Sequence, residues 1–361
     1  MFIRHLVDFN DLSLAEWDIL FDTARDIMEN PSKYMKSCEG RIMATLFFEP
    51  STRTMFSFQS AMLRLGGQII GFSEPKNSSV SKGEVLKDTI KVISGYADII
   101  TIRHPLEGAA FAAAMECENT ALINAGDGGH LHPTQTLTDL TTIRMEKGRT
   151  NDLTIGMCGD LINGRTVHSL IKAMSHFKNI KFYFISPSNL KVPPRLLSML
   201  ARKGYEYTET ESLEDAIPHL DILYMTRIQR ERFTSEDEYN KSKGVYILNR
   251  EKLASAKSDM LVMHPLPRVD EISHDVDDDE RAVYFKQARY GMYIRMALIY
   301  HMLNSPTENV RLPALIDTDA RCDNPRCITN HEHYLPPMFA RVKSHPDIRY
   351  CLYCEKQYKT K

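Results

Sequence analysis

Short apolar runs that alternate with segments of helical periodicity restrict the fold of this chain more than any other feature. In the first 150 residues the pattern predicts buried strands at 41–48, 68–72, 97–103 and 121–125. Helices are predicted to follow these strands, at 51–65, 84–96, 107–117 and 133–147. A repeated strand–helix order of this kind predicts a mostly parallel sheet with helices on both faces.

The pattern restarts after the polar segment 148–152, where we expect a domain boundary. Further strands are predicted at 153–158, 181–185, 222–226 and 260–264, and further helices at 165–177 and 284–303. We therefore expect an α/β chain with two doubly wound parallel-sheet domains. The aperiodic, proline-containing segment 304–320 predicts a linker to a small C-terminal domain.

Composition excludes several classes of protein. The 361 residues carry 45 Lys and Arg against 47 Asp and Glu, so the whole chain lacks the basic footprint of a nucleic-acid binder. No apolar run reaches the ~20 residues of a membrane span, and the first 13 residues do not resemble a secretory leader. Of seven cysteines, four lie in the last 40 residues, which favours a reducing, cytoplasmic location and a local metal site.

The segment Phe47–Thr54 carries the sharpest chemical signal. An apolar strand ends at Pro50, and Ser51, Thr52, Arg53 and Thr54 then open a helix. The free N–H groups and the dipole of a helix N-terminus favour an anion, and hydroxyl and guanidinium groups add donors for phosphate oxygens. The alternative is an ordinary serine cap beside a surface arginine.

Three other predicted strands also end in polar groups. These ends are 103–105 (RHP), 127–135 (DGGHLHPTQ) and 264–268 (HPLPR). Each is weak alone, because a single histidine after a strand is more often structural than catalytic. Together they place donors where open α/β sheets bind ligands, and so predict one cleft.

The C-terminal cysteines form a strong metal pattern: Cys322-x4-Cys327, then 23 residues, then Cys351-x2-Cys354. Four thiolates in two close pairs suit a tetrahedral, structural Zn²⁺. A segment of about 40 residues needs such help to fold. His331, His333 and His345 lie between the pairs and are alternative ligands.

In order and spacing, six motifs resemble those of aspartate carbamoyltransferase catalytic chains, over residues 1 to about 305. They are FEPSTRT, RHP, HPTQ, GRTVHSL, TRIQRER and HPLPRVDEI. STRT and HPTQ belong to the wider carbamoyltransferase family. HPLPR with TRIQ resembles the aspartate branch, whereas the ornithine branch typically has a cysteine-containing HCLP segment.

The resemblance implies transfer of the carbamoyl group of carbamoyl phosphate to the amine of L-aspartate, an early step of pyrimidine biosynthesis. It implies a carbamoyl phosphate domain at 1–147, completed by a helix at about 286–304, an aspartate domain at 148–285, a linker at 305–320 and a zinc domain at 321–361. The implied carbamoyl phosphate ligands are Ser51, Thr52, Arg53, Thr54, Arg103, His132, Gln135 and the carbonyls of Leu266 and Pro267. The implied aspartate ligands are Lys82, Arg165, Arg227 and Gln229.

The expected chemistry agrees with this assignment. As the amine attacks, negative charge develops on the carbonyl oxygen, where Thr54, Arg103 and His132 act as an oxyanion hole worth roughly 3–4 kcal/mol per donor. Arg165 and Arg227 suit a dicarboxylate, because a guanidinium fork matches a carboxylate. The departing phosphate can take the proton, so no enzyme nucleophile or organic cofactor is required. His132 is therefore expected to polarise the carbonyl.

Two further expectations concern movement and assembly. Segment 77–84 resembles the mobile active-site loop of the family, through which Ser78 and Lys82 reach a neighbouring subunit. This resemblance implies a homotrimer. Without the resemblance, the segment would be interpreted as an exposed, solvated loop. The resemblance also implies that Glu49 bridges to Arg165 and Arg232 of the other domain when substrates bind.

The C-terminal segment resembles the zinc domain of the aspartate carbamoyltransferase regulatory chain, which docks on the catalytic chain. The nucleotide-binding domain that normally precedes it has no counterpart here, so control by CTP or ATP through that domain is not expected. Two trimers joined through zinc domains remain a possible assembly. The alternatives are a carbamoyltransferase for another amine, a zinc-linked assembly protein, or a nucleic-acid tail, since residues 321–361 carry a net charge of +4. We expect no nucleic-acid or membrane partner.

Overall fold

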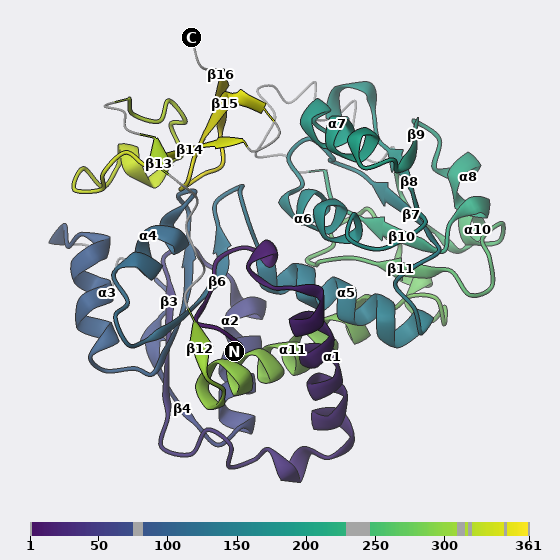
Figure 1. The fold of residues 1–361 in the computed structure, drawn as a ribbon. Coiled ribbons are helices and arrows are strands. Elements are labelled where there is room, and N and C mark those ends of the chain that lie inside the picture. The colour runs from purple at the N-terminus through teal and green to yellow at the C-terminus, as the bar shows by residue number, and fades with distance from the viewer. Residues whose placement is uncertain are drawn as a thin grey trace. The chain divides into compact units, whose positions relative to one another are not determined.

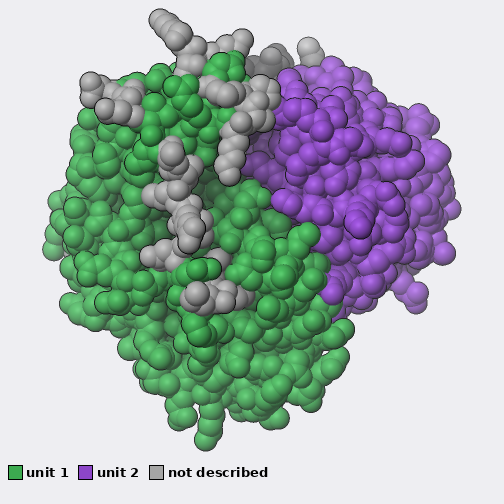
Figure 2. All heavy atoms as spheres, in the orientation of Figure 1, with its two compact units in different colours: residues 1–134, 292–361 green, residues 135–291 purple. Residues whose placement is uncertain are grey.

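The computed structural model describes residues 2–74, 82–228, 246–308, 315–316, 320–342 and 345–359. The chain divides into two compact units (Figure 2), here called unit 1 (Met1–Thr134 and Met292–Lys361) and unit 2 (Gln135–Gly291). Helices α5 (Pro133–Lys147) and α11 (Tyr284–Asn304) each cross from one unit to the other. The domain boundaries expected from the sequence stay predictions.

The main sheet of unit 1 has the strand order β2-β6-β5-β3-β4, and all its pairs are parallel. Figure 1 labels β6, β3 and β4 of this sheet. In that order the strands are His5–Leu6, Ala121–Asp127, Ile99–His104, Ile42–Phe47 and Gln68–Phe72. The connecting helices are α2 (Thr52–Arg64), α3 (Leu86–Ser94) and α4 (Ala109–Met115). Because β4 and β5 lie on opposite sides of β3, the strand order reverses between β3 and β5, which is where open sheets bind ligands.

The N-terminal part of unit 1 adds α1 (Leu14–Glu29), which begins with a capping box between Ser13 and Glu16. Strand β1 (Phe2–Ile3) pairs in parallel with β12 (Thr307–Glu308). The predicted linker therefore contributes to a sheet within its described residues, because pairing satisfies backbone groups that an open loop would leave to water.

Unit 2 repeats the same design. Its parallel sheet has the order β11-β10-β7-β8-β9. In that order the strands are Leu261–Met263, Ile222–Met225, Leu153–Cys158, Ile180–Ile185 and Glu206–Thr210. Its shorter helices are α6 (Arg165–Met174), α7 (Pro194–Arg202), α8 (Leu213–Ala216) and α10 (Arg250–Leu253). Here the strand order reverses between β7 and β10.

The C-terminal residues form a small antiparallel sheet, β13-β14-β15-β16. These strands are Leu315–Ile316, Phe339–Val342, His345–Cys351 and Gln357–Lys359. We call residues 320–359 the C-terminal module. Two parallel α/β sheets with a small C-terminal domain are thus confirmed. The described 3₁₀ turns are Phe9–Asp11, Pro31–Lys33, Ser188–Leu190, Ile217–His219, His274–Val276 and Ile328–Asn330.

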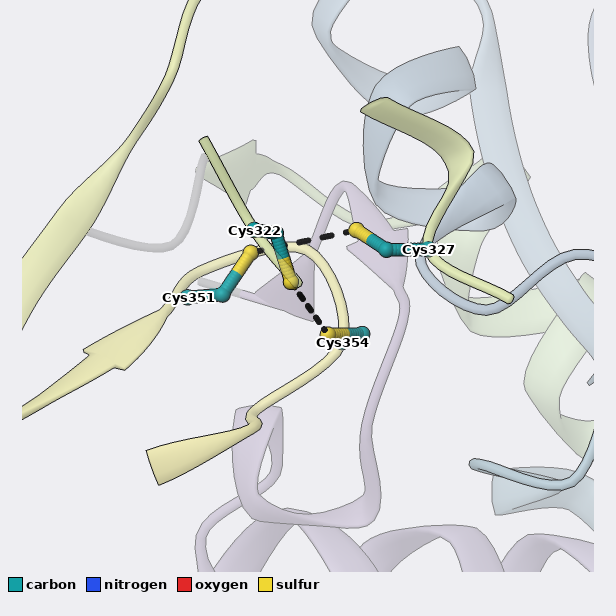
Figure 3. A group of neighbouring side chains, drawn as sticks. All are labelled: Cys322, Cys327, Cys351 and Cys354. Atoms are coloured by element: carbon teal, nitrogen blue, oxygen red, sulfur yellow. Dashed lines mark hydrogen bonds between the residues drawn. The ribbon is translucent and has the colours of Figure 1, made fainter. Parts of the chain in front are cut away.

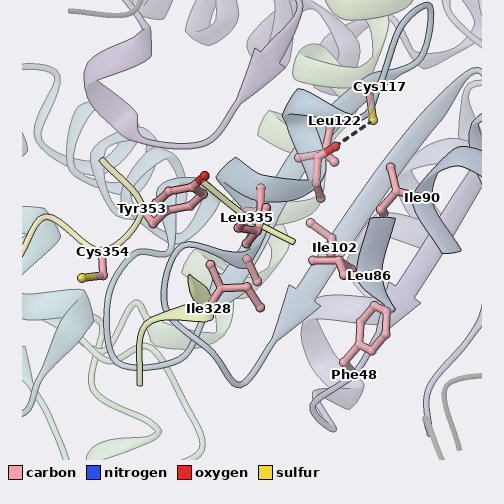
Figure 4. Packing of buried hydrophobic residues seen from close by; sticks show 14 of the residues in the cluster. Phe48, Leu86, Ile90, Ile102, Cys117, Leu122, Ile328, Leu335, Tyr353 and Cys354 are labelled. Carbon is pink, nitrogen blue, oxygen red and sulfur yellow. Dashed lines mark hydrogen bonds between the residues drawn. The ribbon is translucent and has the colours of Figure 1, made fainter. Parts of the chain in front are cut away.

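The module packs on the α/β part of unit 1 through one shared core (Figure 4). Buried Ile328, Leu335 and Tyr353 of the module belong to the same hydrophobic cluster as Ile102 of β5 and the alanines of α4. Five of the seven α4 residues are alanine, and such small side chains allow close approach. Gly108, at φ +84°, precedes this helix, and a Cβ there would lie 2.6 Å from the Cβ of Tyr353.

Among the described residues, no helix is both long enough and apolar enough to cross a lipid bilayer.

Candidate active site and metal cluster

Helix α2 opens at the reversal point of the unit 1 sheet, directly after β3. Ser51 is its N-cap residue, but the Ser51 side chain makes no capping hydrogen bond to the helix. Its hydroxyl donates instead to Oγ1 of Thr54, at 3.1 Å. This is not the ordinary serine cap that was the alternative from sequence, and the first-turn N–H groups are left for another acceptor.

Arg103, at the end of β5, is the buried cation of this site, with a side-chain exposure of 8%. Its Nη2 donates to Oε1 of Glu49 at 3.0 Å, and its Nη1 donates to the carbonyl oxygen of Ala125 at 3.2 Å. Partial burial, and then the charge of Arg103, lower the pKa of Arg53. The two guanidinium charges repel each other, and an anion bound beside them would relieve this repulsion.

Gly126, near the end of β6, brings Arg103 close to His132. The φ of Gly126 is +123°, and a Cβ there would lie 2.8 Å from Nη1 of Arg103 and 3.6 Å from Cδ2 of His132. His132 is buried. Three neighbouring strands, β3, β5 and β6, thus deliver the predicted phosphate and carbonyl ligands to one edge of the sheet.

The reversal point of the unit 2 sheet holds two more predicted ligands. Arg165 is the first residue of α6, and Arg227 follows β10. A Cβ on Gly159, whose φ is +118°, would lie 2.2 Å from the carbonyl oxygen of Thr226. This close approach joins the ends of β7 and β10, the two strands that precede the arginines.

The segment after β11 is held by His264. The backbone N–H of Leu266 donates to Nδ1 of His264 at 2.8 Å, so Nε2 carries the proton and donates to Oε1 of Glu271 at 2.7 Å. Burial raises the pKa of Glu271, but His264 and backbone donors outweigh it and lower the pKa overall. The peptide bond between Leu266 and Pro267 is cis.

Four buried cysteines gather in the C-terminal module (Figure 3). Their Sγ atoms all lie within 4.8 Å of one another, and two of the separations are 3.5 Å (Cys322 to Cys354) and 3.9 Å (Cys327 to Cys351). Four thiolates at the usual Zn–S length of ~2.3 Å in a tetrahedron stand roughly 3.8 Å apart. The cluster is therefore close to the arrangement that a tetrahedral metal ion requires.

Two of the three histidine alternatives, His331 and His333, do not belong to this cluster. His331 is exposed, and its Nε2 lies 2.8 Å from the carbonyl oxygen of Pro325. His333 is also exposed, and the side chain of His345 lies outside the described residues. Two hydroxyl groups lie within hydrogen-bonding distance of sulfur atoms in the cluster. The Tyr358 hydroxyl lies 2.9 Å from Sγ of Cys322, and the Thr329 hydroxyl lies 3.2 Å from Sγ of Cys327.

Comparison with known protein families agrees with this geometry. Residues 4–145 match the carbamoyl-P binding domain of aspartate/ornithine carbamoyltransferase, and residues 151–302 match its Asp/Orn binding domain. The chain belongs to the aspartate/ornithine carbamoyltransferase family. Residues 316–361 match the metal-binding domain of the aspartate carbamoyltransferase regulatory chain.

Individual relatives place the chain in the aspartate branch of this carbamoyltransferase family. It is 58% identical over 300 residues to the aspartate carbamoyltransferase catalytic subunit of Clostridium novyi, covering 83% of this chain and 98% of that one. The M. jannaschii catalytic subunit has a TM-score of 0.79 at 49% identity, covering 83% and 98% of the two chains. A Trypanosoma cruzi aspartate transcarbamoylase in complex with N-(phosphonacetyl)-L-aspartic acid has a TM-score of 0.77 at 37% identity, covering 83% and 95%. The chain is an aspartate carbamoyltransferase catalytic chain with a C-terminal domain of the regulatory-chain metal-binding type.

The remaining residues predicted for the carbamoyltransferase site are Ser78, Lys82, Gln229 and Arg232. Lys82 is described and exposed. Ser78, Gln229 and Arg232 lie outside the described residues.

A buried hydrogen-bond network that we do not predict from sequence supports two of the predicted carbamoyltransferase ligands. They are Gln135 and, through His264, Leu266. Asp139 of α5 is fully buried, and its Oδ1 accepts from Gln135 at 2.8 Å and from Gln287 at 2.7 Å. Its Oδ2 accepts from the Tyr224 hydroxyl at 3.0 Å. Gln287 in turn accepts from the backbone N–H of His264 at 3.0 Å. The spacing of Gln135 and Asp139 on one helix face was the only sequence signal.

Proposed function

We propose that the groups after β3, β5 and β6 of unit 1 bind carbamoyl phosphate and that those after β7 and β10 of unit 2 bind L-aspartate. The activity is that of aspartate carbamoyltransferase, which forms N-carbamoyl-L-aspartate and phosphate in pyrimidine biosynthesis. In support, a relative from Trypanosoma cruzi forms complexes with carbamoyl phosphate and aspartate, and with carbamoyl aspartate and phosphate.

The observation that carries the proposal is the meeting of three strand ends at the reversal point of the unit 1 sheet. The α2 N-terminus with Ser51, Thr52, Arg53 and Thr54 supplies phosphate donors. Arg103, from the neighbouring strand, adds a buried positive charge. Phosphate is the ligand that this combination suits best.

The reaction needs donors at the carbonyl oxygen of carbamoyl phosphate. The amine of aspartate attacks the carbonyl carbon, and the carbon–oxygen bond to phosphate breaks. Thr54, Arg103 and His132 stabilise the charge on the carbonyl oxygen. The departing phosphate takes the amine proton. Gln135 and the carbonyl oxygens of Leu266 and Pro267 hold the carbamoyl amino group.

The aspartate side depends on charge. Arg165 and Arg227 each take one carboxylate, assisted by Gln229 and by Lys82, the latter from a neighbouring subunit. On binding, Glu49 turns to Arg165 and Arg232. The pairing of Arg165 and Arg227 at adjacent strand ends supports this assignment.

A direct test compares amine acceptors. The full chain, supplied with carbamoyl phosphate, is expected to release phosphate with L-aspartate and not with L-ornithine. Arg53→Ala should lower kcat/KM for carbamoyl phosphate by at least 100-fold, whereas Arg64→Ala, at the other end of α2, should not. Transfer to ornithine alone would assign the chain to another carbamoyltransferase.

For the metal we propose Zn²⁺ in a structural role, held by Cys322, Cys327, Cys351 and Cys354. With four protein ligands the ion has no open position for substrate. None of the seven cysteines, all of which are described, takes part in a disulfide, which supports a cytoplasmic location.

For the assembly we propose a homotrimer. Phe56 and Leu63 lie seven residues apart on one face of α2, and both residues are more than half exposed, as is Met35. A second copy that covers this apolar face would explain it. Light scattering of the zinc-loaded protein should give the mass of three chains, and a mass of six would mean that the modules join trimers.

A further inference from the structure

The turn that carries His132 is held from the side of the C-terminal module. We call residues 127–132 the His132 turn. Asp127 is 1% exposed, and its Oδ1 accepts from the backbone N–H of Leu131 at 2.9 Å. Its Oδ2 accepts from Gly108 at 2.8 Å and lies 3.1 Å from Nδ1 of His130.

His130 connects this turn to the module. Its side chain is 10% exposed, and its Nε2 lies 3.5 Å from Oε2 of Glu355, which directly follows Cys354. Burial lowers the pKa of His130, but Asp127 and then Glu355 outweigh it, so the pKa stands well above its ordinary value. The imidazole ring thus lies between one carboxylate from the turn and one from the module.

The module also holds the segment that follows Arg103. The backbone N–H of Glu107 donates to the carbonyl oxygen of Arg326 at 2.9 Å, and the N–H of Ile328 donates to the carbonyl oxygen of Glu107 at 2.9 Å. The Asn324 side chain donates to Oε2 of Glu107 at 2.7 Å. Both strand ends that carry donors for the carbonyl oxygen are therefore in contact with the module.

We propose that Glu355 is a positioning residue for carbamoyl transfer, acting through His130 on the turn that places His132. The inference rests on the proposed role of His132 at the carbonyl oxygen. An oxyanion donor must sit within a few tenths of an ångström of its productive place. The Asp127 carboxylate holds the His132 turn through Leu131 and His130, and His130 also joins the turn to the module. These contacts restrain the position of His132.

The test is a double-mutant cycle in the full, zinc-loaded chain. Glu355→Gln and His130→Gln should each lower kcat about tenfold, with KM for carbamoyl phosphate changed less than twofold. The double variant should fall no further, because both changes break one connection. Lys356→Gln is the matched control, since it removes an ion pair with Asp323 inside the module and should leave kcat unchanged.

Zinc content and thermal unfolding of each variant separate positioning from folding. If Glu355→Gln loses zinc, His130→Gln, which lies outside the module, decides the question. A wild-type kcat in a zinc-loaded Glu355→Gln or His130→Gln protein, or multiplicative losses in the double variant, would overturn the proposal. Lack of aspartate carbamoylation by the unmodified chain would instead refute the proposed function.

Discussion

Glu49 Oε1 accepts a hydrogen bond from Nη2 of Arg103 at 3.0 Å, so this carboxylate is paired inside unit 1. Arg103 is also the proposed donor to the substrate carbonyl. Glu49 must therefore exchange one arginine for others if it is to turn to Arg165 and Arg232. The side chain of Glu49 is 34% exposed, which leaves it room to do so.

Glu49→Gln tests this exchange. The amide keeps the size of the side chain but removes the charge that attracts the second set of arginines. We expect KM for aspartate to rise and kcat to fall, each about tenfold, in steady-state assays. The matched control Glu39→Gln changes an exposed carboxylate elsewhere in unit 1. Unchanged kinetics in Glu49→Gln would rule out the exchange.

Asp139→Asn tests the buried network of unit 2. The asparagine nitrogen would face a donor, and an unsatisfied buried polar group costs roughly 1–3 kcal/mol. Because a neutral amide with one oxygen holds Gln135 and Gln287 less strongly than the carboxylate does, kcat/KM for carbamoyl phosphate should fall at least tenfold and Tm should drop. Asp22→Asn, which removes an ion pair between the exposed side chains of Asp22 and Arg25, should change stability by less than about 1 kcal/mol. Equal effects of the two substitutions would contradict the role of Asp139.

Part of the fold could be predicted from the local sequence pattern. Helix Pro133–Lys147 and strand Leu153–Cys158 agree residue for residue with the sequence prediction, because a proline start and an unbroken apolar run mark them clearly. We make no sequence prediction for Glu206–Thr210, whose charged residues lie on an exposed edge strand with no apolar run to detect. Leu14–Glu29 is also unpredicted, although the capping box of Ser13 and Glu16 was a usable signal.

Contacts between distant residues were beyond sequence pattern. Asn324 and Glu107 are 217 positions apart, and neither is distinguished from a surface residue by its neighbours. The burial of Asp139 depends likewise on Gln287, 148 positions away. The cysteine spacing, by contrast, predicted its cluster, since short loops hold each pair together.

Metal removal should unfold the C-terminal module. Structural zinc contributes on the order of 10 kcal/mol to small zinc domains, and this module is too small to fold on its core alone. Cys327→Ser should bind less than one zinc per chain and should be cut by protease within the module. Cys38→Ala, which removes a buried thiol of unit 1 outside the module, should retain one zinc per chain. A zinc-free module that resists protease would contradict the structural role.

Acid sensitivity of unit 2 should depend on His168. Burial lowers the pKa of His168 to about 4, and its Nε2 lies 2.7 Å from the carbonyl oxygen of Leu161. Below its ordinary pKa of ~6.5 the unfolded chain binds a proton that the folded chain does not, so stability falls as pH decreases.

The size of this effect can be measured by urea unfolding at pH 7.5 and pH 5. His168 alone should cost the native protein about 2 kcal/mol between these values. His168→Gln should therefore lose less stability on acidification than the unmodified chain, by about that amount. His219→Gln, at an exposed position, should behave like the unmodified chain. If His168→Gln and the unmodified chain lose the same amount of stability on acidification, His168 is charged in the folded protein.

The short connection to the module has a consequence for how it stays bound. Only eleven residues separate Glu308, the last residue of β12, from Ala320, the first residue of the module. A partner tethered by a short segment experiences an effective concentration on the order of millimolar, whatever the concentration of the protein. Dilution therefore cannot detach the module, and each catalytic chain keeps one copy. A free metal-binding domain of the same type would have to compete against that local concentration for the same surface.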